Sequence, residues 1–314
     1  MEARFQIQRF DPEADKRPYD KTYEVTLAEG ATILDGLLQI KDEMDGTLSF
    51  RRSCRSAICG SCAVRVNGHA VLACKTQIEP HLRNGVLKVS PIGNMRVIKD
   101  LVVDMTPFWQ QVRGIQPWLS TKPTVPEREN VVDMKLVQPL FKPAQCIMCA
   151  SCYSDCNVVD SDKAFAGPAA LAKGYRFVAD VRDNSTSDRI KRMSAARATW
   201  ECSRCYTCVE VCPKHVAPLD CISLLRSKTI EAGVTETPGA RHVEAFVESV
   251  KHTGRLNEVT LPLKTRGLDP KALLSMAPIG IRMLIKGKLP MPFEQPIPNV
   301  EEIRRIIETV EENK

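Results

Sequence analysis

The sequence predicts an α+β protein in which a small sheet domain precedes a helical region. Residues 4–10 and 21–27 alternate apolar and polar residues as half-buried strands do, and a helical pattern follows over 31–44. From residue 146 onward, two cysteine-rich runs alternate with helical segments instead. We therefore expect three parts: a mixed α/β domain over 1–105, a helical domain over 106–232 and a helical C-terminal extension over 233–314.

The first domain contains a helix and a hairpin that the sequence marks clearly. AVRVNGHAVL (63–72) is two short strands around Asn67-Gly68, a dipeptide that favours tight hairpin turns. VLKVSP (86–91) predicts a closing strand. The helical pattern over 31–44 places these apolar residues on one face: Ile33, Leu34, Leu37, Leu38 and Ile40.

The region that follows is rich in proline, which excludes one continuous helix over 106–145. We interpret it as a linker that packs against both halves; its prolines are Pro117, Pro123, Pro126, Pro139 and Pro143. GPAALAKGYRFVADV and TSDRIKRMSAARATWE predict helices between the cysteine runs. In the extension, a helix should end at Gly254 and another should begin at Asn299. Their apolar stripes are expected to pack on the chain's own core: Val243, Phe246, Val247 and Val250, then Val300, Ile303, Ile306, Ile307 and Val310.

Composition excludes several classes of protein. The net charge of +6 is small and scattered, which argues against a nucleic-acid partner. The opening residues MEARFQIQRF show no leader pattern, so a reducing compartment is expected and a disulfide framework for the 13 cysteines is not. No uncharged apolar run is long enough to span a membrane, and the nearest candidate, 272–285, is interrupted by Pro278 and Arg282.

The first cysteine group has the spacing of a plant-type [2Fe–2S] site. Its C-x4-C-x2-C pattern with a distant fourth cysteine comprises Cys54, Cys59, Cys62 and Cys74. A short loop here lets several backbone N–H groups reach the sulfurs, and Gly60 allows close approach. The alternative is a zinc site, but zinc usually takes ligands from paired C-x2-C motifs and this group offers one such pair.

The two later runs share the spacing C-x2-C-x2-C-x3-C, and the second ends with Pro213. In such pairs the fourth cysteine of each run binds the cluster of the other run. This rule assigns one [4Fe–4S] cluster to Cys146, Cys149, Cys152 and Cys212. It assigns the other to Cys156, Cys202, Cys205 and Cys208. Three clusters held only by cysteine suit stepwise electron transfer.

With these motifs in order, the chain resembles the iron–sulfur subunit of the succinate dehydrogenase/fumarate reductase family. The resemblance covers about residues 1–230 and rests on LSFRRSCRSAICGSCAVRVNG, PIGNMRVIKDLVVDM (91–105), CIMCASC and the CPK of the second run. It implies a β-grasp [2Fe–2S] ferredoxin domain followed by an α-helical ferredoxin domain. It also implies an FAD-bearing flavoprotein partner, a membrane anchor that exchanges electrons with quinone, and a peripheral position on the cytoplasmic face of the membrane through these partners. The activity implied is that of a succinate:quinone oxidoreductase whose dicarboxylate site lies on the flavoprotein.

The chain departs from this family at the third cluster and in its tail. Most members lack the cysteine that stands here as Cys205 and hold a [3Fe–4S] cluster on three thiols, which correspond to Cys156, Cys202 and Cys208. We predict a [4Fe–4S] third cluster, or [3Fe–4S] if Cys205 does not bind iron. Asn157 and Ser203 stand where the family often has quinone-side residues.

Two alternatives to this function follow from the same residues. KHTGRLNE (251–258) and KGKLP (286–290) resemble the small iron–sulfur subunit of heterodisulfide reductases. The chain is then a subunit of a thiol:fumarate reductase or a heterodisulfide-reductase-like complex. The other alternative is an interaction protein stabilised by zinc. Cys221 lies outside all three groups and is expected to be a small buried thiol.

Overall fold

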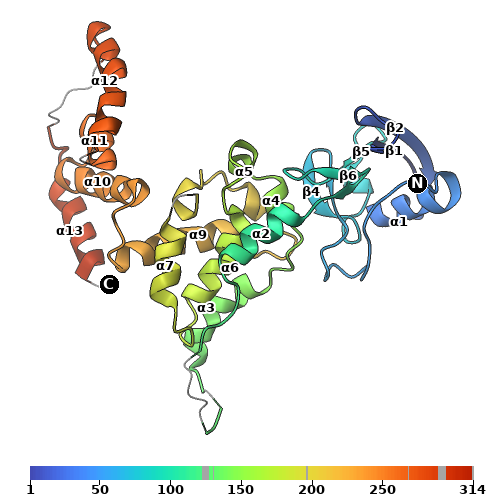
Figure 1. Ribbon diagram of the computed structural model, residues 1–314, viewed down its shortest axis with the longest axis horizontal. Helices are drawn as coiled ribbons and strands as arrows, with labels where there is room; N and C mark the ends of the chain where they lie inside the picture. Colours follow the sequence, from blue (N-terminus) through green and yellow to red (C-terminus); the bar gives the residue numbers. More distant parts are fainter. Residues whose placement is uncertain (122–126, 130, 196, 268, 289–294, 313–314) are drawn as a thin grey trace. The chain divides into compact units, whose positions relative to one another are not determined.

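The computed structural model describes residues 1–121, 127–129, 131–195, 197–267, 269–288 and 295–312 (Figure 1). Pro123 and Pro126 of the predicted linker, and the end of the KGKLP segment at 289–290, lie outside these residues. The chain divides into two compact units, Met1–Leu225 and Arg226–Lys314. None of the helices in the described part of the chain combines the length and the apolar character that crossing a bilayer requires.

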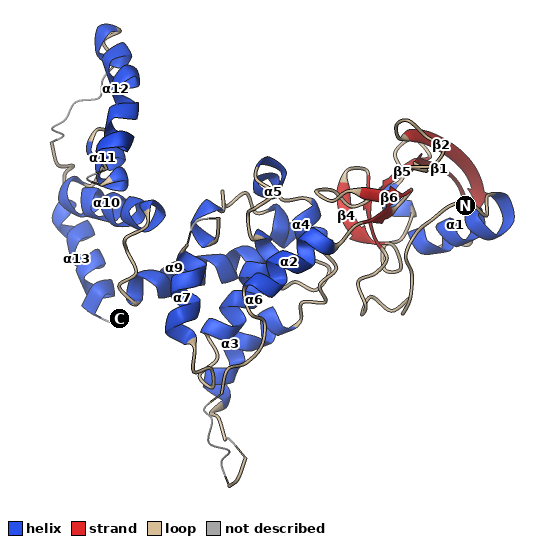
Figure 2. Cartoon of the chain, in the orientation of Figure 1, coloured by secondary structure: helices blue, strands red, loops and turns tan. Residues whose placement is uncertain are grey.

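The first unit begins with a five-stranded mixed sheet in the order β2-β1-β5-β3-β4 (Figure 2). Strand β1 pairs antiparallel with β2 and parallel with β5, and β3 pairs antiparallel with both β4 and β5. The strands are β1 (Glu2–Arg9), β2 (Tyr19–Thr26), β3 (Ala63–Val66), β4 (His69–Leu72) and β5 (Val86–Ser90). The predicted strands, the hairpin at Asn67-Gly68 and the closing strand are therefore confirmed.

Helix α1 (Ile33–Gln39) packs its apolar face on this sheet and continues as a π-helical turn, Ile40–Met44. Thr32 and Asp35 form a reciprocal cap at its first turn, which fixes where the helix begins. Gly36 lies directly against the ring of Phe5 on β1, where any side chain would collide with the ring. This close contact places the helix on the sheet in the β-grasp arrangement.

A buried charge network connects β1 to two distant loops. Arg9 is only 5% exposed and donates from Nε to Asp100 Oδ1 at 2.9 Å and from Nη1 to Asp45 Oδ2 at 2.8 Å. Arg9 Nη2 donates to Thr47 Oγ1 at 2.9 Å. The second Asp100 oxygen, Oδ2, accepts from the Ser49 backbone N–H at 2.8 Å. Burial opposes the charge on Arg9, but the two carboxylates outweigh it and raise the guanidinium pKa. The loop that leads to Cys54 is thus anchored to the sheet.

A two-stranded sheet follows, of β6 (Val97–Lys99) and β7 (Val102–Val103). The rest of the first unit is mainly helical and is organised around α6 (Gly167–Val178), which is buried along most of its length. Helices α2, α3, α4 and α7 all pack against it (Figure 1). The small residues of GPAALAKG allow these neighbours to approach closely. The helices are α2 (Thr106–Gly114), α3 (Met134–Ala144), α4 (Ser151–Ser154), α5 (Asn157–Ser161), α7 (Thr186–Ser194) and α8 (Thr207–Glu210). Helix α9 (Pro218–Glu231) begins in this unit and ends in the second.

The proline-rich region between the domains is more helical than a simple linker. It forms two helices, α2 and α3, with Pro117 between them, and so the prediction that no single helix crosses it is confirmed. Pro139 and Pro143 lie inside α3. Phe108 of α2 is buried and meets Tyr153 edge to face, with ring centroids 5.6 Å apart. The region therefore contributes directly to the helical core.

Polar contacts fasten the sheet to the end of the first cysteine run. Arg65 on β3 donates from Nε to Asp155 Oδ1 at 2.8 Å, and the Ala70 backbone N–H donates to Asp155 Oδ2 at 2.8 Å. Asn94, from the PIGNMRV segment, donates through its side-chain amide to the carbonyl of Cys156 at 3.0 Å. These contacts give the PIGNMRV segment a structural role: it fixes the backbone that carries Cys156.

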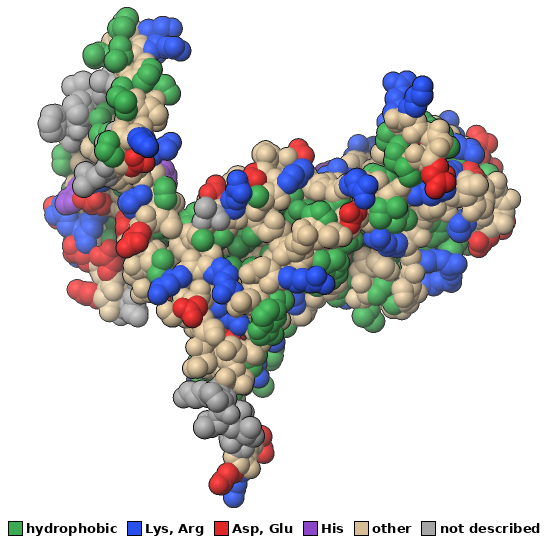
Figure 3. Space-filling model, in the orientation of Figure 1, with side chains coloured by type: hydrophobic (Ala, Val, Ile, Leu, Met, Phe, Trp, Pro, Cys, Tyr) green, Lys and Arg blue, Asp and Glu red, His purple; other side chains and the backbone are tan. Residues whose placement is uncertain are grey.

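The second unit is helical, and α10 packs against both α11 and α13. Gly254 ends α10 in the left-handed conformation at φ 71°, as predicted. The prediction that the apolar stripes pack on the chain's own core is wrong for part of each helix, because Phe246, Val247, Ile306 and Val310 are exposed. Apolar side chains are also exposed along α12 (Figure 3). The helices are α10 (Pro238–Thr253), α11 (Thr260–Arg266), α12 (Pro270–Ile285) and α13 (Val300–Glu312).

The Arg9 network predicts a large effect of one substitution in the first unit. Asp100→Ala should lower the free energy of unfolding by about 3 kcal/mol, because it leaves Arg9 buried beside one carboxylate fewer. The midpoint of thermal bleaching of the visible iron–sulfur absorbance should fall by about 10 °C. Asp160→Ala is the matched control, since it removes an exposed ion pair with Lys163 at 3.4 Å and should change the midpoint little. Equal midpoints for the two variants would contradict this account.

Candidate metal centres

The first cysteine group occupies a loop before β3 and the turn after β4. The Sγ atom of Cys54 accepts hydrogen bonds from the backbone N–H groups of Ser56, Ile58 and Cys59, at 3.4, 3.4 and 3.3 Å. The predicted convergence of backbone N–H groups on a sulfur is thereby confirmed at this cysteine. Such bonds stabilise a thiolate and raise the potential of a cluster that the thiolate binds.

Two other members of this group flank the hairpin in sequence: Cys62 directly precedes β3, and Cys74 follows β4. The Ala73 N–H donates to the Cys62 carbonyl at 3.1 Å, which brings Cys62 and Cys74 to the same end of the β3–β4 ladder. Burial raises the pKa of the Cys62 thiol to about 12. The Ser61 hydroxyl, 3.1 Å from the Cys59 sulfur, lowers the pKa of Cys59 to about 6. The group therefore has one end facing solvent and one end in the core.

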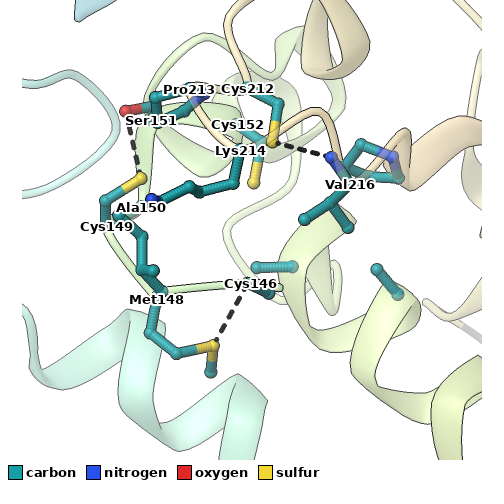
Figure 4. A pocket seen from close by; sticks show the side chains of 14 residues that line it. Cys146, Met148, Cys149, Ala150, Ser151, Cys152, Cys212, Pro213, Lys214 and Val216 are labelled. Carbon is teal, nitrogen blue, oxygen red and sulfur yellow. Dashed lines mark hydrogen bonds between the residues drawn. The ribbon is translucent and has the colours of Figure 1, made fainter. Parts of the chain in front are cut away.

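The second group lines a single cavity, although its members come from both cysteine runs (Figure 4). The cavity has a volume of about 380 Å³, counting its open mouth. Four thiols line it: Cys146, Cys149, Cys152 and Cys212. Cys212 Sγ accepts the backbone N–H of Val216 at 3.4 Å, and Ser151 Oγ lies 3.3 Å from Cys149 Sγ. Most of the remaining wall is apolar, including Ala169 and Ala172 of α6.

The electrostatics of this cavity suit a cationic cluster rather than free thiolates. Burial raises the pKa values of Cys146, Cys149 and Cys152, and repulsion from neighbouring cysteines adds to the effect. Lys173 of α6 opposes this at Cys146, where its charge favours the thiolate. Iron would replace the thiol protons and supply the positive charge that the cavity lacks. The residues present therefore fit a cysteine-bound [4Fe–4S] cluster.

The third group is formed by the second run and the last cysteine of the first run. Burial raises the pKa of Cys208 to about 12, with further contributions from the charges of Cys202, Cys156 and Cys205. Burial also raises the pKa of Cys156, and the charges of Cys205 and Cys202 add to the effect. These four thiols are therefore close enough for their charges to interact. Cys156 and Cys208 are buried, whereas Cys205 is exposed.

The backbone around Cys205 repeats the backbone around Cys149. The next residue adopts the left-handed conformation in both places, Ala150 at φ 62° and Tyr206 at φ 71°, and a four-residue helix follows. A hydroxyl then reaches back to the sulfur, from Ser151 to Cys149 and from Thr207 to Cys205. Burial acts against the Cys205 thiolate, but this hydrogen bonding outweighs it and lowers the pKa. Cys205 is therefore presented in the same local geometry as Cys149.

The three groups follow one another in space. Gly60 of the first group lies against Cys149 of the second, since a Cβ atom at Gly60 would be 2.8 Å from the Cys149 Cβ. The charge of Cys208 in the third group contributes to the raised pKa of Cys152 in the second. The middle group thus adjoins both of the others, and the exposed cysteines, Cys59 and Cys205, belong to the two outer groups.

Several neighbours of these groups were not identified from the sequence. Lys173 and the Ser151 and Thr207 hydroxyls act on cysteines through contacts that cysteine spacing does not encode, although a hydroxyl two residues after Cys59, Cys149 and Cys205 was a readable signal. Cys221 is buried, as predicted. In the described part of the chain, no three His, Cys, Asp or Glu side chains converge closely enough to hold a single metal ion.

Comparison with known proteins identifies both domains. Residues 4–110 match the family model of a 2Fe-2S iron–sulfur cluster binding domain, and residues 143–216 match that of a 4Fe-4S dicluster domain. One chain of the apo Mycobacterium smegmatis Sdh1 complex has a similar fold, with a TM-score of 0.69 and 23% identity over 75% of this chain and 98% of that one. The predicted order of a sheet ferredoxin domain and a helical ferredoxin domain is thereby confirmed.

Two relatives cover different lengths of the chain. The 8-methylmenaquinol:fumarate reductase iron–sulfur subunit of Wolinella succinogenes is 36% identical over 91% of this chain and 90% of its own. The fumarate reductase iron–sulfur subunit of Mycobacterium tuberculosis is 40% identical over 69% of this chain and 88% of its own. The first alignment is longer than Met1–Leu225 and must include part of the second unit. The chain belongs to the family of iron–sulfur subunits of fumarate reductases and succinate dehydrogenases.

The contact between the first two groups predicts a difference between two glycines. Gly60→Ala places a Cβ against Cys149 in a left-handed turn at φ 72°, whereas Gly68→Ala at φ 94° meets nothing within 4 Å. Both changes strain the backbone, at a cost of about 1 kcal/mol, but only Gly60→Ala should also displace the Cys149 loop. We expect Gly60→Ala to lower the iron content per chain and alter the magnetic coupling between neighbouring clusters in EPR spectra. An identical loss in Gly68→Ala would show that strain alone is responsible.

Proposed function

We propose that the chain transfers electrons through three iron–sulfur clusters between membrane quinone and an FAD-bearing partner that interconverts succinate and fumarate. The main support for this proposal is the spatial order of the three cysteine groups. Gly60 of the first group lies against Cys149 of the second, and Cys152 of the second interacts electrostatically with Cys208 of the third. When bound, the clusters supply one-electron transfer. The chain's own contribution is to hold the thiolates, limit water access and adjust the charge around each group.

The ligand sets that we propose follow the three groups. The [2Fe–2S] cluster is held by Cys54, Cys59, Cys62 and Cys74. The [4Fe–4S] cluster is held by Cys146, Cys149, Cys152 and Cys212. The first set is supported by the loop and hairpin that collect its sulfurs, and the second by the common cavity. Because cysteines occupy every protein-ligand position, the dicarboxylate chemistry is assigned to the flavoprotein partner.

We assign the third cluster as [4Fe–4S] on Cys156, Cys202, Cys205 and Cys208. Its support is the repetition around Cys205 of the Cys149 geometry, including the left-handed residue and the hydroxyl that reaches the sulfur. A fourth thiolate adds negative charge and lowers the potential relative to a three-thiolate site. The third cluster is therefore expected to be a weaker oxidant than a [3Fe–4S] cluster in the same place.

The electron-exchange partners are proposed from the relatives. The relative that shares part of the second unit is named as an 8-methylmenaquinol:fumarate reductase subunit, which favours a quinol as the electron donor and fumarate as the acceptor. We place the flavoprotein at the [2Fe–2S] end and the membrane anchor with its quinone at the third cluster. We further propose that the complex lies on the cytoplasmic face of the membrane, as the family resemblance implies.

The function is tested by EPR spectroscopy of the complex purified with its partner subunits. The clusters are first reduced with dithionite, the excess is removed, and fumarate is added. We expect the [2Fe–2S] and [4Fe–4S] signals of the reduced complex to be lost within seconds, with succinate as the product, and a reduced quinone analogue to restore them. Oxidation by a heterodisulfide but not by a quinone would instead establish the thiol-linked alternative.

Removing Cys205 tests the third cluster. Cys205→Ala should convert it to [3Fe–4S], lowering the iron content from about ten to about nine atoms per chain. The oxidised variant should show the near-isotropic EPR signal of a [3Fe–4S] cluster, which the parent chain should lack, and the potential of that cluster should rise because one thiolate is gone. Cys221→Ala is the control and should leave both readings unchanged. A parent chain that already carries this signal, unaltered by Cys205→Ala, would overturn the assignment.

A further inference from the structure

Helix α12 exposes apolar side chains around most of its circumference. Leu274 is 75% exposed and Ile285 is 79% exposed, and the same is true to a lesser degree of Ile279, Ile281 and Leu284. Figure 3 shows apolar side chains over the visible face of this helix. The helix packs on α11 at one end, yet these five apolar residues do not turn toward the rest of the unit. Exposure on this scale indicates a surface that is covered in use.

The polar residues of α12 lie in one narrow stripe, and its charged members are all basic. At 100° per residue, Lys271, Ser275, Arg282 and Lys286 fall within about 60° of one another around the helix axis. Lys288 follows immediately after the helix. Between residues 270 and 288 the sequence has no acidic residue. Arg282 and Lys286 are both exposed.

This combination indicates the kind of surface that α12 contacts. A wide apolar face beside a cationic stripe is the pattern of helices that lie in the interface of an anionic bilayer. Long Lys and Arg side chains can keep their charges among lipid headgroups while the apolar face enters the acyl region. The stripe runs from the first turn of the helix to just past its end. A helix that lies in the membrane plane can therefore place each of these cations beside a lipid headgroup. A protein groove would account for the apolar face but not for a stripe of one charge sign.

We propose that α12 lies in the headgroup region of an anionic lipid bilayer, with Leu274, Ile281 and Leu284 inserted and Arg282 and Lys286 among the lipid phosphates. The chain then contacts the membrane directly, in addition to its attachment through partner subunits. Membrane contact of this kind depends neither on the clusters nor on the identity of the quinone. Its failure and the failure of the proposed electron transfer are therefore separate outcomes.

Vesicle flotation of the full chain with its clusters tests this proposal. The vesicles are phosphatidylcholine with about one third phosphatidylglycerol, compared with phosphatidylcholine alone. We expect binding to the anionic vesicles to weaken about 30-fold in the double variant Arg282→Gln/Lys286→Gln, since each cation near the surface contributes about fivefold. The double variant Ile281→Asp/Leu284→Asp should lose at least tenfold, because it places charge on the inserted face.

The matched control is Ile306→Asp/Val310→Asp, which alters two exposed apolar residues of α13 in the same unit and should bind as the parent chain does. Visible absorbance shows that each variant keeps its clusters, and far-UV circular dichroism shows that the helices of the second unit remain folded. Two results would overturn the proposal: a parent chain that does not float with anionic vesicles, or α12 variants that float as well as the parent. If instead Ile281→Asp/Leu284→Asp detaches a partner subunit while lipid binding is absent, α12 seats a protein and the lipid proposal is wrong.

Discussion

The structure of the first unit depends on Cys212 reaching the cavity formed by the first cysteine run. For a cysteine more than fifty residues downstream to line the same space as Cys146, the chain between them must fold back on itself. Helix α6 makes this possible, because its small residues let α2, α3, α4 and α7 pack closely around it while Ala169 and Ala172 form part of the cavity wall. The buried thiols beside it have raised pKa values and repel one another as thiolates, so iron binding and folding are coupled in this domain. The cysteines proposed to hold the electron-transfer cluster are thus also part of the core of this domain.

Polar contacts hold the sheet domain to this core. Asp155 bridges Arg65 and the Ala70 N–H, and Asn94 binds the Cys156 carbonyl; both act on the backbone between the second and third groups. Gly60 approaches Cys149 directly. Gly60 thus determines how closely the first two cysteine groups approach, and the position of Cys156 in the third group depends on its neighbour Asp155 and on Asn94. Substitutions in either place are expected to alter electron transfer without removing a ligand.

Much of this was predictable because its signals are local. The alternation of β1 and β2, the Asn67-Gly68 turn and the cysteine spacings each lie within a short window, and the resemblance to a known family joined them in the right order. The partners of Asp155 lie 85 and 90 residues away, and no pattern in the sequence selects them. In the tail, the apolar stripes of α10 and α13 were correctly placed on helices. Periodicity identifies the apolar face of a helix but not what covers that face, and Phe246 and Ile306 are in fact exposed.

The distribution of exposure along the three groups makes the first and the third group the points of access for redox partners. Each outer group has a solvent-exposed cysteine, Cys59 in the first and Cys205 in the third, whereas the four cysteines of the middle group are half-buried. A redox partner can therefore approach either end of the series. At the third group, Ser203 Oγ lies 3.2 Å from Asn157 Oδ1 and donates to it, so the two residues that depart from the common family pattern contact each other beside Cys156 and Cys202. Besides the tail, the residues that depart from the family pattern therefore lie together at the third group: Asn157, Ser203 and Cys205.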